Sequence, residues 1–363
     1  MSHSKPKYLQ IYSEIANAIK NQEYAPGDLL PTEEVLCKKH ATSRPTVAKA
    51  LRLLAKEKIV KRRAGFGTQV LAPGKSSITA GLLIPNLHST EIFTPICASL
   101  TEAAGMEAMR IVRPLELEIP TEDPCQLAEI LTQRFIDEKV HGVFFSPLEH
   151  IPNQERFNRG ILRKLDEAGI RIVLLDRDVY AWPQQTPHDL VGIDNIEAGY
   201  TIGSHLIANG CKTPAFVSIP NPAMTVRLRR IGARESLAHF GRDTREMLDI
   251  CFHPEAPEKT AQELLDKKVD GILCANDATA AQLLRALLDL GAKIPESIRV
   301  CGFDDVKYAS LLSVPLTSYH QPCRAIGKVA ARVMINRIKN PDTPAHRVSL
   351  AGRLIVRESS TPV

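Results

Sequence analysis

The sequence predicts a two-part α/β protein, in which a small helical domain with a two-stranded wing precedes a large domain of parallel sheets flanked by helices. Three observations support this fold class. Between Pro31 and Val70, two short amphipathic helical patterns and two short strands follow one another with brief turns. From Thr79 onward, short apolar strands alternate with helical patterns in two successive series. Residues 73–77, rich in Gly and Ser and without periodicity, are typical of a linker.

The composition excludes several classes of protein. Hydrophobic residues make up 44% and charged residues 24% of the 363 residues, which is typical of soluble chains with two or three domains. No apolar run reaches ~18 residues and no signal peptide opens the sequence, so we expect a cytoplasmic protein without membrane segments. The eight cysteines are scattered, with no CxxC pair and no Cys/His cluster at metal spacing. We therefore expect no disulfide, metal or cofactor.

The net charge of +5 is unevenly distributed. Residues 1–77 contain 14 of the 46 Lys and Arg residues but only 6 of the 41 Asp and Glu residues, a balance of +8. The remaining 32 cations face 35 anions, a balance of −3. A basic N-terminal domain on a mildly acidic body indicates that only the N-terminal domain binds a polyanion.

The N-terminal domain reads as three helices followed by a hairpin. Apolar residues recur at helical spacing from Tyr8 to Asn21, and a second helix opens after Thr32, which can cap it, and ends near His40. The third helix opens at Ser43, a suitable N-cap, with Pro45 in its first turn. Its polar face carries cations and a hydroxyl: Arg44, Thr46, Lys49, Arg52 and Lys56. Such a helix fits a DNA major groove in shape and charge.

The segments YLQIYSEIANAI, PGDLLPTEEVL, SRPTVAKALRLLAKEKIV and GFGT make residues 5–72 resemble the winged helix-turn-helix domain of the GntR family of bacterial repressors, and we expect the whole domain to span 1–72. The resemblance implies contacts to double-stranded operator DNA. The candidates from the motif and the polar face together are Thr32, Glu33, Ser43, Arg44, Pro45, Thr46, Lys49, Arg52 and Gly65. Arg44 is our candidate for a guanine contact, with a contact to phosphate alone as the alternative. Ala48 stands where many family members have Arg, which shifts base reading toward Arg44, Thr46 and Lys49.

Polar residues follow four strands of the large domain. They are Asp176-Arg177-Asp178, Asp194-Asn195, Asn276-Asp277 and Asp304-Asp305. Each group can simply cap the next helix. Together they favour a polar pocket, because ligands bind outside the carboxyl ends of parallel strands. Carboxylates, amides and a guanidinium suit the hydroxyl groups of a sugar.

The segments GLLIPN, IVLLDRD, GIDNIEAGYTIGSHLIANG, RLRRIGARESL and CANDATAAQLLRAL make residues 78–358 resemble the effector domain of the LacI family. This resemblance implies a two-lobed, periplasmic-binding-protein-like fold, with lobe one at about 78–188 and 321–347 and lobe two at about 189–318 and 348–358. It implies effector contacts from Asp176, Arg177, Arg229, Asn276, Asp304 and Gln321. Arg227 and Asp277 are further candidates, with a loop-holding role as the alternative for Asp277.

The two parts together predict a dimeric transcriptional regulator whose operator affinity is controlled by a small sugar, and the resemblance to both families implies a repressor. The pairing of the two domain types resembles arabinose-responsive repressors, so L-arabinose is one candidate effector, and a monosaccharide, a short oligosaccharide or a purine stays open. A solute receptor without regulation is an alternative that leaves the basic domain unexplained. An enzyme is a third, but the sequence offers no Schiff-base lysine context, phosphate loop or catalytic triad.

Overall fold

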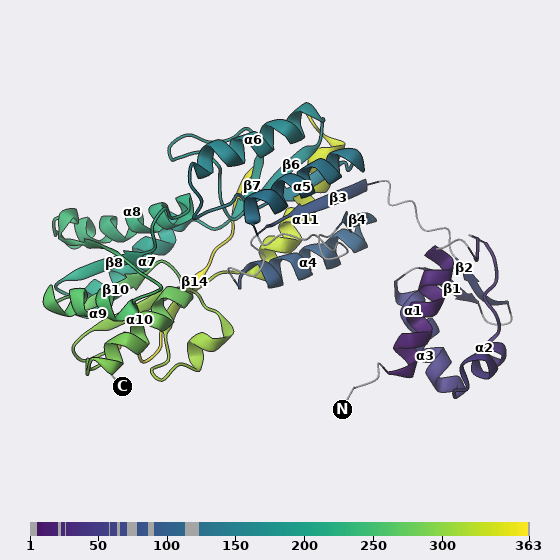
Figure 1. Ribbon diagram of the computed structural model, residues 1–363, viewed down its shortest axis with the longest axis horizontal. Coiled ribbons are helices and arrows are strands. Elements are labelled where there is room, and N and C mark those ends of the chain that lie inside the picture. Colours follow the sequence, from purple (N-terminus) through teal and green to yellow (C-terminus); the bar gives the residue numbers. More distant parts are fainter. Residues whose placement is uncertain are drawn as a thin grey trace. The chain divides into compact units, whose positions relative to one another are not determined.

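The computed structural model describes residues 6–20, 23–25, 27–57, 59–63, 66–70, 78–85, 91–112 and 123–361 (Figure 1). The chain divides into two compact units, Met1–Ser77 and Ile78–Val363. The predicted α/β class, with a winged helix-turn-helix unit and parallel sheets flanked by helices, is confirmed. The predicted linker at 73–77 lies outside the described residues.

The first unit contains α1 (Lys7–Lys20), α2 (Glu33–His40), α3 (Arg44–Lys56), β1 (Val60–Arg63) and β2 (Gly67–Val70). The strands β1 and β2 pair antiparallel and form the wing. The core is made by apolar residues that recur at helical spacing on α1 and α3, among them Ile11, Ile15, Val47, Leu51 and Leu54. Ala41, with φ 44°, ends α2 in a left-handed turn, which separates it from α3.

The first lobe of the second unit is a six-stranded parallel sheet in the order β13-β7-β6-β5-β3-β4. Its elements are β3 (Ile78–Leu83), α4 (Phe93–Met106), β4 (Met109–Val112), α5 (Pro124–Asp137), β5 (Gly142–Phe145), α6 (Gln154–Glu167), β6 (Arg171–Leu175), β7 (Asp189–Gly192), α11 (Cys323–Lys339) and β13 (Arg347–Ser349). Helices cover both faces, so the central strand β5 is buried along its whole length.

The second lobe is a six-stranded sheet in the order β14-β12-β11-β10-β8-β9, parallel except for β14. Its elements are α7 (Asn195–Ala208), β8 (Pro214–Ser218), α8 (Met224–His239), η2 (Thr244–Glu246), β9 (Leu248–Cys251), α9 (Pro257–Asp266), β10 (Gly271–Cys274), α10 (Asp277–Asp289), β11 (Arg299–Asp304), η3 (Lys307–Ser310), β12 (Thr317–His320) and β14 (Arg353–Ile355).

The chain crosses between the lobes three times: after β7, after β12 and after β13. The expected lobe boundary at about 189 needs correction, because β7 pairs with β6 and belongs to the first sheet. The boundary between 347 and 348 also falls inside β13, which is wholly in the first sheet. A loop rather than a helix joins β6 to β7. The alternation of strands and helices in the sequence therefore did not show that β7 pairs with β6.

Candidate functional sites

The predicted DNA-reading face lies on α3 and the residues before α2. The Arg44 side chain is 78% exposed, and its Nε lies 3.3 Å from Glu33 Oε2. Glu33 also pairs with Arg62 of the wing. One largely buried carboxylate therefore ties the start of α3 to β1, and it orients two arginines on the exposed side of the domain.

The other predicted DNA contacts occupy several local environments. Thr32 caps α2 through a 3.4 Å bond from the Val35 amide. Ser43 stands at the N-cap of α3, but its hydroxyl lies 3.0 Å from Thr46 Oγ1 instead of bonding a backbone amide. The ammonium of Lys49 lies 4.0 Å from the Tyr8 ring centroid, and Arg52 bonds the Ala48 carbonyl.

Pro45 is exposed in the first turn of α3. Gly65 lies outside the described residues.

A cavity of about 260 Å³ opens between the two lobes where the carboxyl ends of their strands meet. Five of the six predicted effector residues line it: Asp176, Arg177, Arg229, Asn276 and Asp304. The sixth, Gln321, reaches the cavity indirectly, because its Nε2 donates to Asp304 Oδ1 at 2.7 Å. Residues separated by up to 145 positions in the sequence thus form one polar cluster.

On the side of lobe one, the cavity wall is an ion-paired group. Arg177 is 6% exposed and pairs with both Glu149 and Asp176, the latter at 3.0 Å. Burial works against its charge, but the two carboxylates prevail and raise the pKa of Arg177 above its usual range. Burial likewise acts to raise the pKa of Glu149, yet Arg177 and His150 lower it overall. The pair therefore remains charged inside the domain.

Asp176 follows β6 in a left-handed conformation, with φ 69°. Its Oδ2 accepts from Arg177, while the buried Oδ1 has no hydrogen-bond partner among the described residues. A buried carboxylate oxygen without a partner is costly, and a ligand hydroxyl would supply the missing donor.

On the side of lobe two, the central group is Arg229 on α8, which is 4% exposed. Its Nε donates to Asn195 Oδ1 at 2.9 Å and its Nη1 to the Ala275 carbonyl at 2.8 Å. Its guanidinium carbon lies 3.5 Å from the centroid of the Phe303 ring, a cation–π contact. Both of these hydrogen bonds leave the Nη2 group of Arg229 for other contacts.

Two glycines bring the α8 backbone close to α7. A Cβ at Gly199 would lie 1.9 Å from the Arg229 carbonyl oxygen, and a Cβ at Gly232 would lie 1.9 Å from that of Ile196. Only a residue without a side chain permits this contact, which places Arg229 beside Asn195.

Two buried acids of lobe two have raised pKa values. Burial raises the pKa of Asp304 to about 7, against the attraction of Arg229. Burial and the charge of Asp304 raise the pKa of Asp277 to about 8. Asp277 accepts from the Ser318 hydroxyl at 2.6 Å and the Val306 amide at 2.9 Å, so it holds a loop and lies outside the cavity wall. Asn276 lines the cavity and also caps α10 through Thr279.

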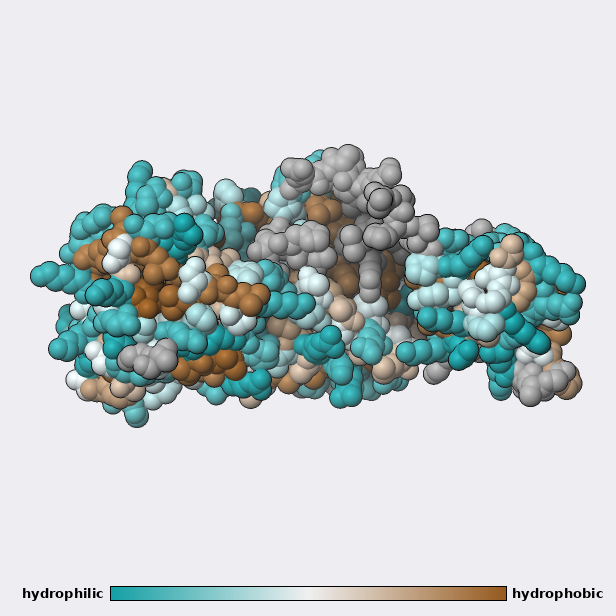
Figure 2. Space-filling view, turned by 90° about the horizontal axis from the view of Figure 1, so that it is seen from below, coloured by the Kyte–Doolittle hydropathy of each residue, from teal (hydrophilic) through white to brown (hydrophobic). Residues whose placement is uncertain are grey.

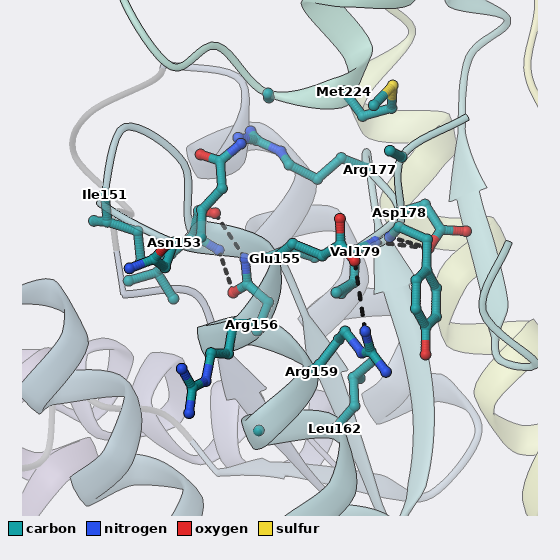
Figure 3. Close-up of a pocket in the computed structure, with 18 of the residues that line it drawn as sticks. Ile151, Asn153, Glu155, Arg156, Arg159, Leu162, Arg177, Asp178, Val179 and Met224 are labelled. Carbon is teal, nitrogen blue, oxygen red and sulfur yellow. Dashed lines mark hydrogen bonds and ion pairs between the residues drawn. The ribbon is translucent and has the colours of Figure 1, made fainter. Parts of the chain in front are cut away.

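A larger hollow, of about 990 Å³, is a groove between α6, the loop after β6 and residues 221–227 (Figure 3). Several charged side chains of this groove pair with one another, including Glu155 with Arg159 at 3.6 Å and Glu167 with Arg163 at 3.8 Å. In Figure 3, Arg177 and Met224 lie toward one end and Arg156 and Leu162 toward the other. We favour the smaller cavity as the effector site, because five of the six predicted effector residues line it and because it lies at the carboxyl ends of the parallel strands.

Three strand-end acids have structural roles. Asp178 accepts from the Val179 and Tyr180 amides, and Asp194 caps α7. Asp305 pairs with His320 and Arg357. The exposed Arg227 lines the larger groove and not the smaller cavity.

Sequence reasoning missed Glu149, Phe303 and the role of Asn195. Glu149 stands four residues beyond β5, so it was not among the groups directly at strand ends. Phe303 reads as a buried strand residue, and nothing in its neighbourhood signals an arginine on its face. Asn195 was noted at a strand end, but its bond to Arg229, 34 residues away, is visible only in three dimensions.

Two known families match parts of the chain. Residues 7–70 match the family described as bacterial regulatory proteins, gntR family, and residues 204–360 match a periplasmic binding protein-like domain. The chain therefore carries a GntR-family DNA-binding domain joined to a periplasmic-binding-protein-like domain. This two-part construction defines a DNA-binding transcriptional regulator.

Among curated proteins, the chain is similar to the arabinose metabolism transcriptional repressor of Geobacillus stearothermophilus, with 26% identity over 92% of each protein. It is 33% identical to the regulator CelR of Thermobifida fusca over 54% of this chain and 58% of CelR. It is 24% identical to the ribose operon repressor of Halalkalibacterium halodurans over 79% of this chain and 80% of that protein.

Solved structures share the fold. The CelR–cellobiose complex superposes with a TM-score of 0.66, at 24% identity over 91% of this chain and all of that one. A LacI-family regulator of Enterococcus faecium with bound ribose superposes with a TM-score of 0.64, at 23% identity over 78% of this chain and 99% of that one. No helix among the described residues is long and apolar enough to span a membrane, and no cluster of His, Cys, Asp or Glu there could hold a metal ion.

Proposed function

We propose that this protein is a transcriptional repressor whose operator affinity is controlled by a small sugar in the cavity between its two lobes. The observation that carries the proposal is the cavity itself. Two arginines and three carboxylates from the two lobes line it, and they form a set of donors and acceptors suited to neighbouring hydroxyl groups. A ligand that bonds Arg177 on one lobe and Arg229 on the other favours the closed arrangement of the lobes.

The proposed effector is a neutral polyhydroxylated molecule. The cavity is walled by groups of both charge signs, and its Arg177 is ion-paired with Glu149 and Asp176, so it does not favour an anion. Relatives whose names include arabinose and ribose, and one structure with cellobiose, supply the first probes: L-arabinose, D-ribose and cellobiose.

The proposed DNA-binding unit is a homodimer, because a two-fold protein reads a palindromic site with two recognition helices. Leu311, which follows η3 in the second lobe, is 80% exposed. Figure 2 shows hydrophobic residues gathered on the face of the second lobe that is visible there. Exposed apolar surface of this kind is typical of an interface.

The test is a sugar panel read in two ways. Thermal shift or calorimetry detects binding, and chromatography of the same mixtures detects any new product. Binding without product supports a sensor, whereas turnover of a bound sugar would establish an enzyme and overturn the proposal. Arg159→Ala, in the larger groove, serves as the matched control for Arg229→Ala: the first should bind the sugar normally and the second should not.

A further inference from the structure

We infer that each of the three crossings between the lobes is tied to a sugar-binding side chain, and that Tyr319 and Asn195 are the positioning residues that transmit occupancy of the cavity to the hinge. The inference rests on the proposed function and concerns how the same site is coupled to the rest of the chain. Neither Tyr319 nor Asn195 lines the proposed sugar cavity.

The first crossing is tied to Arg229. The chain leaves β7 at Gly192, passes Ile193 and Asp194, and enters α7 at Asn195. Asn195 is 4% exposed, and its Oδ1 accepts from Arg229 Nε at 2.9 Å. Any shift of the guanidinium toward a ligand therefore pulls on the residue at which the first crossing ends.

The second crossing is tied to Asp304. Gln321 follows β12 directly, and it is 1% exposed. Its Nε2 donates to Asp304 Oδ1 at 2.7 Å, while its buried Oε1 has no partner among the described residues. A ligand that bonds the Asp304 carboxylate therefore competes with, or reorients, the side chain at the start of this crossing.

The third crossing is tied to Arg229 through two stacked rings. Arg229 lies on the face of Phe303, and Phe303 stacks on Tyr319 with ring centroids 5.2 Å apart and planes at 23°. Tyr319 in turn packs against the backbone of Gly352, which lies between β13 and β14. A Cβ at Gly352 would lie 2.3 Å from Tyr319 Cε1, so the segment between β13 and β14 lies directly against the Tyr319 ring.

The first and third crossings are also joined to each other. The Leu350 amide donates to the Gly192 carbonyl at 2.9 Å, and the Asp176 amide donates to the Val191 carbonyl at 2.9 Å. The cavity residue Asp176 is thus bonded to the strand from which the first crossing departs. A bound sugar that contacts Asp176, Arg229 and Asp304 acts on all three crossings together, and such a contiguous set of contacts is what a two-state hinge requires.

Two substitutions of Tyr319 distinguish the role of its ring, which stacks on Phe303, from the role of its hydroxyl group. Tyr319→Phe keeps the stack on Phe303 and removes the hydroxyl next to the Gly352 backbone. Tyr319→Leu removes both. Tyr200→Phe is the matched control, since it deletes a tyrosine hydroxyl in the same lobe from a ring that packs on His239 instead of on Phe303. Asn195→Ala tests the first crossing independently.

For each full-length variant, calorimetry gives the dissociation constant of the sugar that binds the natural protein. Fluorescence anisotropy gives operator affinity without sugar and with saturating sugar, and the ratio of these two affinities measures the coupling. We expect Tyr319→Phe to reduce this ratio several-fold and Tyr319→Leu to reduce it further. Both should still bind sugar and, without sugar, bind operator as the natural protein does. Tyr200→Phe should leave the ratio unchanged, and Asn195→Ala should reduce it.

An unchanged ratio in both Tyr319 variants would overturn the inference, and so would a loss of sugar binding in Tyr319→Phe, since the residue would then support only the pocket. If Tyr319→Leu does not fold, Tyr319→Phe and Asn195→Ala still decide the matter. Failure of the proposed function looks different, because the natural protein itself would then show a ratio of one or bind no sugar.

Discussion

Replacing Asp304 by Asn should weaken sugar binding and yet stabilise the protein at high pH. The substitution preserves shape, and the Asn Oδ1 can still accept from Gln321 Nε2. It removes a carboxylate that burial holds near neutrality, with a pKa of about 7 against 3.8 in an exposed chain. The two effects have opposite signs, so general damage to the fold cannot mimic them together.

The stability effect follows from proton linkage. Because the folded-state pKa lies above the unfolded one, the folded protein keeps a proton that the unfolded chain releases between about pH 4 and pH 7. The free energy of unfolding therefore falls as pH rises through this window, by about 1.4 kcal/mol per unit. Asn cannot ionise, so from pH 5 to pH 8 the variant should gain on the order of 3 kcal/mol relative to the natural protein.

The binding effect follows from the loss of a charged acceptor. A hydrogen bond to a charged group contributes about 1 kcal/mol more than a neutral one, so two sugar hydroxyls on this side chain imply a loss of about 10- to 100-fold in affinity. Urea denaturation at pH 5 and pH 8 measures the first effect, and calorimetry with the bound sugar measures the second. Normal sugar affinity in Asp304→Asn, or a lower relative stability at pH 8 than at pH 5, would refute the assignment.

Four further outcomes are expected. Arg44→Ala should weaken operator binding by about 1–3 kcal/mol and leave the sugar-induced thermal shift intact, as anisotropy and thermal shift together will show. Glu33→Gln should weaken operator binding less, because it loosens Arg44 without removing a cation; a loss equal to that of Arg44→Ala would argue for a direct role of the carboxylate. Leu311→Asp should raise the dimer dissociation constant in sedimentation experiments, and an unchanged constant would place the interface elsewhere. Sugar affinity should rise with pH up to about 7 and then level off, since hydroxyl donors favour ionised Asp304; a fall over that range would show that the neutral acid binds the sugar.

Much of the fold could be predicted because its signals are local. Helical spacing of Val47, Leu51 and Leu54 marks α3, and unbroken apolar runs mark strands buried on both faces. The β7 strand was assigned to the wrong lobe because sheet membership depends on which strand lies beside it. No local pattern contains that information.

The candidate cavity was predictable to the extent that parallel strands deliver their end residues to one edge of a sheet. This rule brought Asp176, Arg177, Asn276 and Asp304 together, but it does not distinguish them from acids that hold loops, such as Asp178. That distinction depends on partners distant in the sequence. The contacts of Arg229 with Phe303 and Asn195 illustrate this limit, since they join three elements through packing that only the folded chain creates.

The central claim, that a sugar in the cavity controls DNA binding, is tested most directly by one titration. The full-length protein is bound to a fluorescent DNA site selected from a random pool, and L-arabinose, D-ribose and cellobiose are added in turn. We predict that a sugar shown by calorimetry to bind changes the operator dissociation constant at least tenfold, and that it has no such effect on Asp304→Asn. A sugar that binds in the cavity and leaves the operator dissociation constant unchanged would contradict the claim.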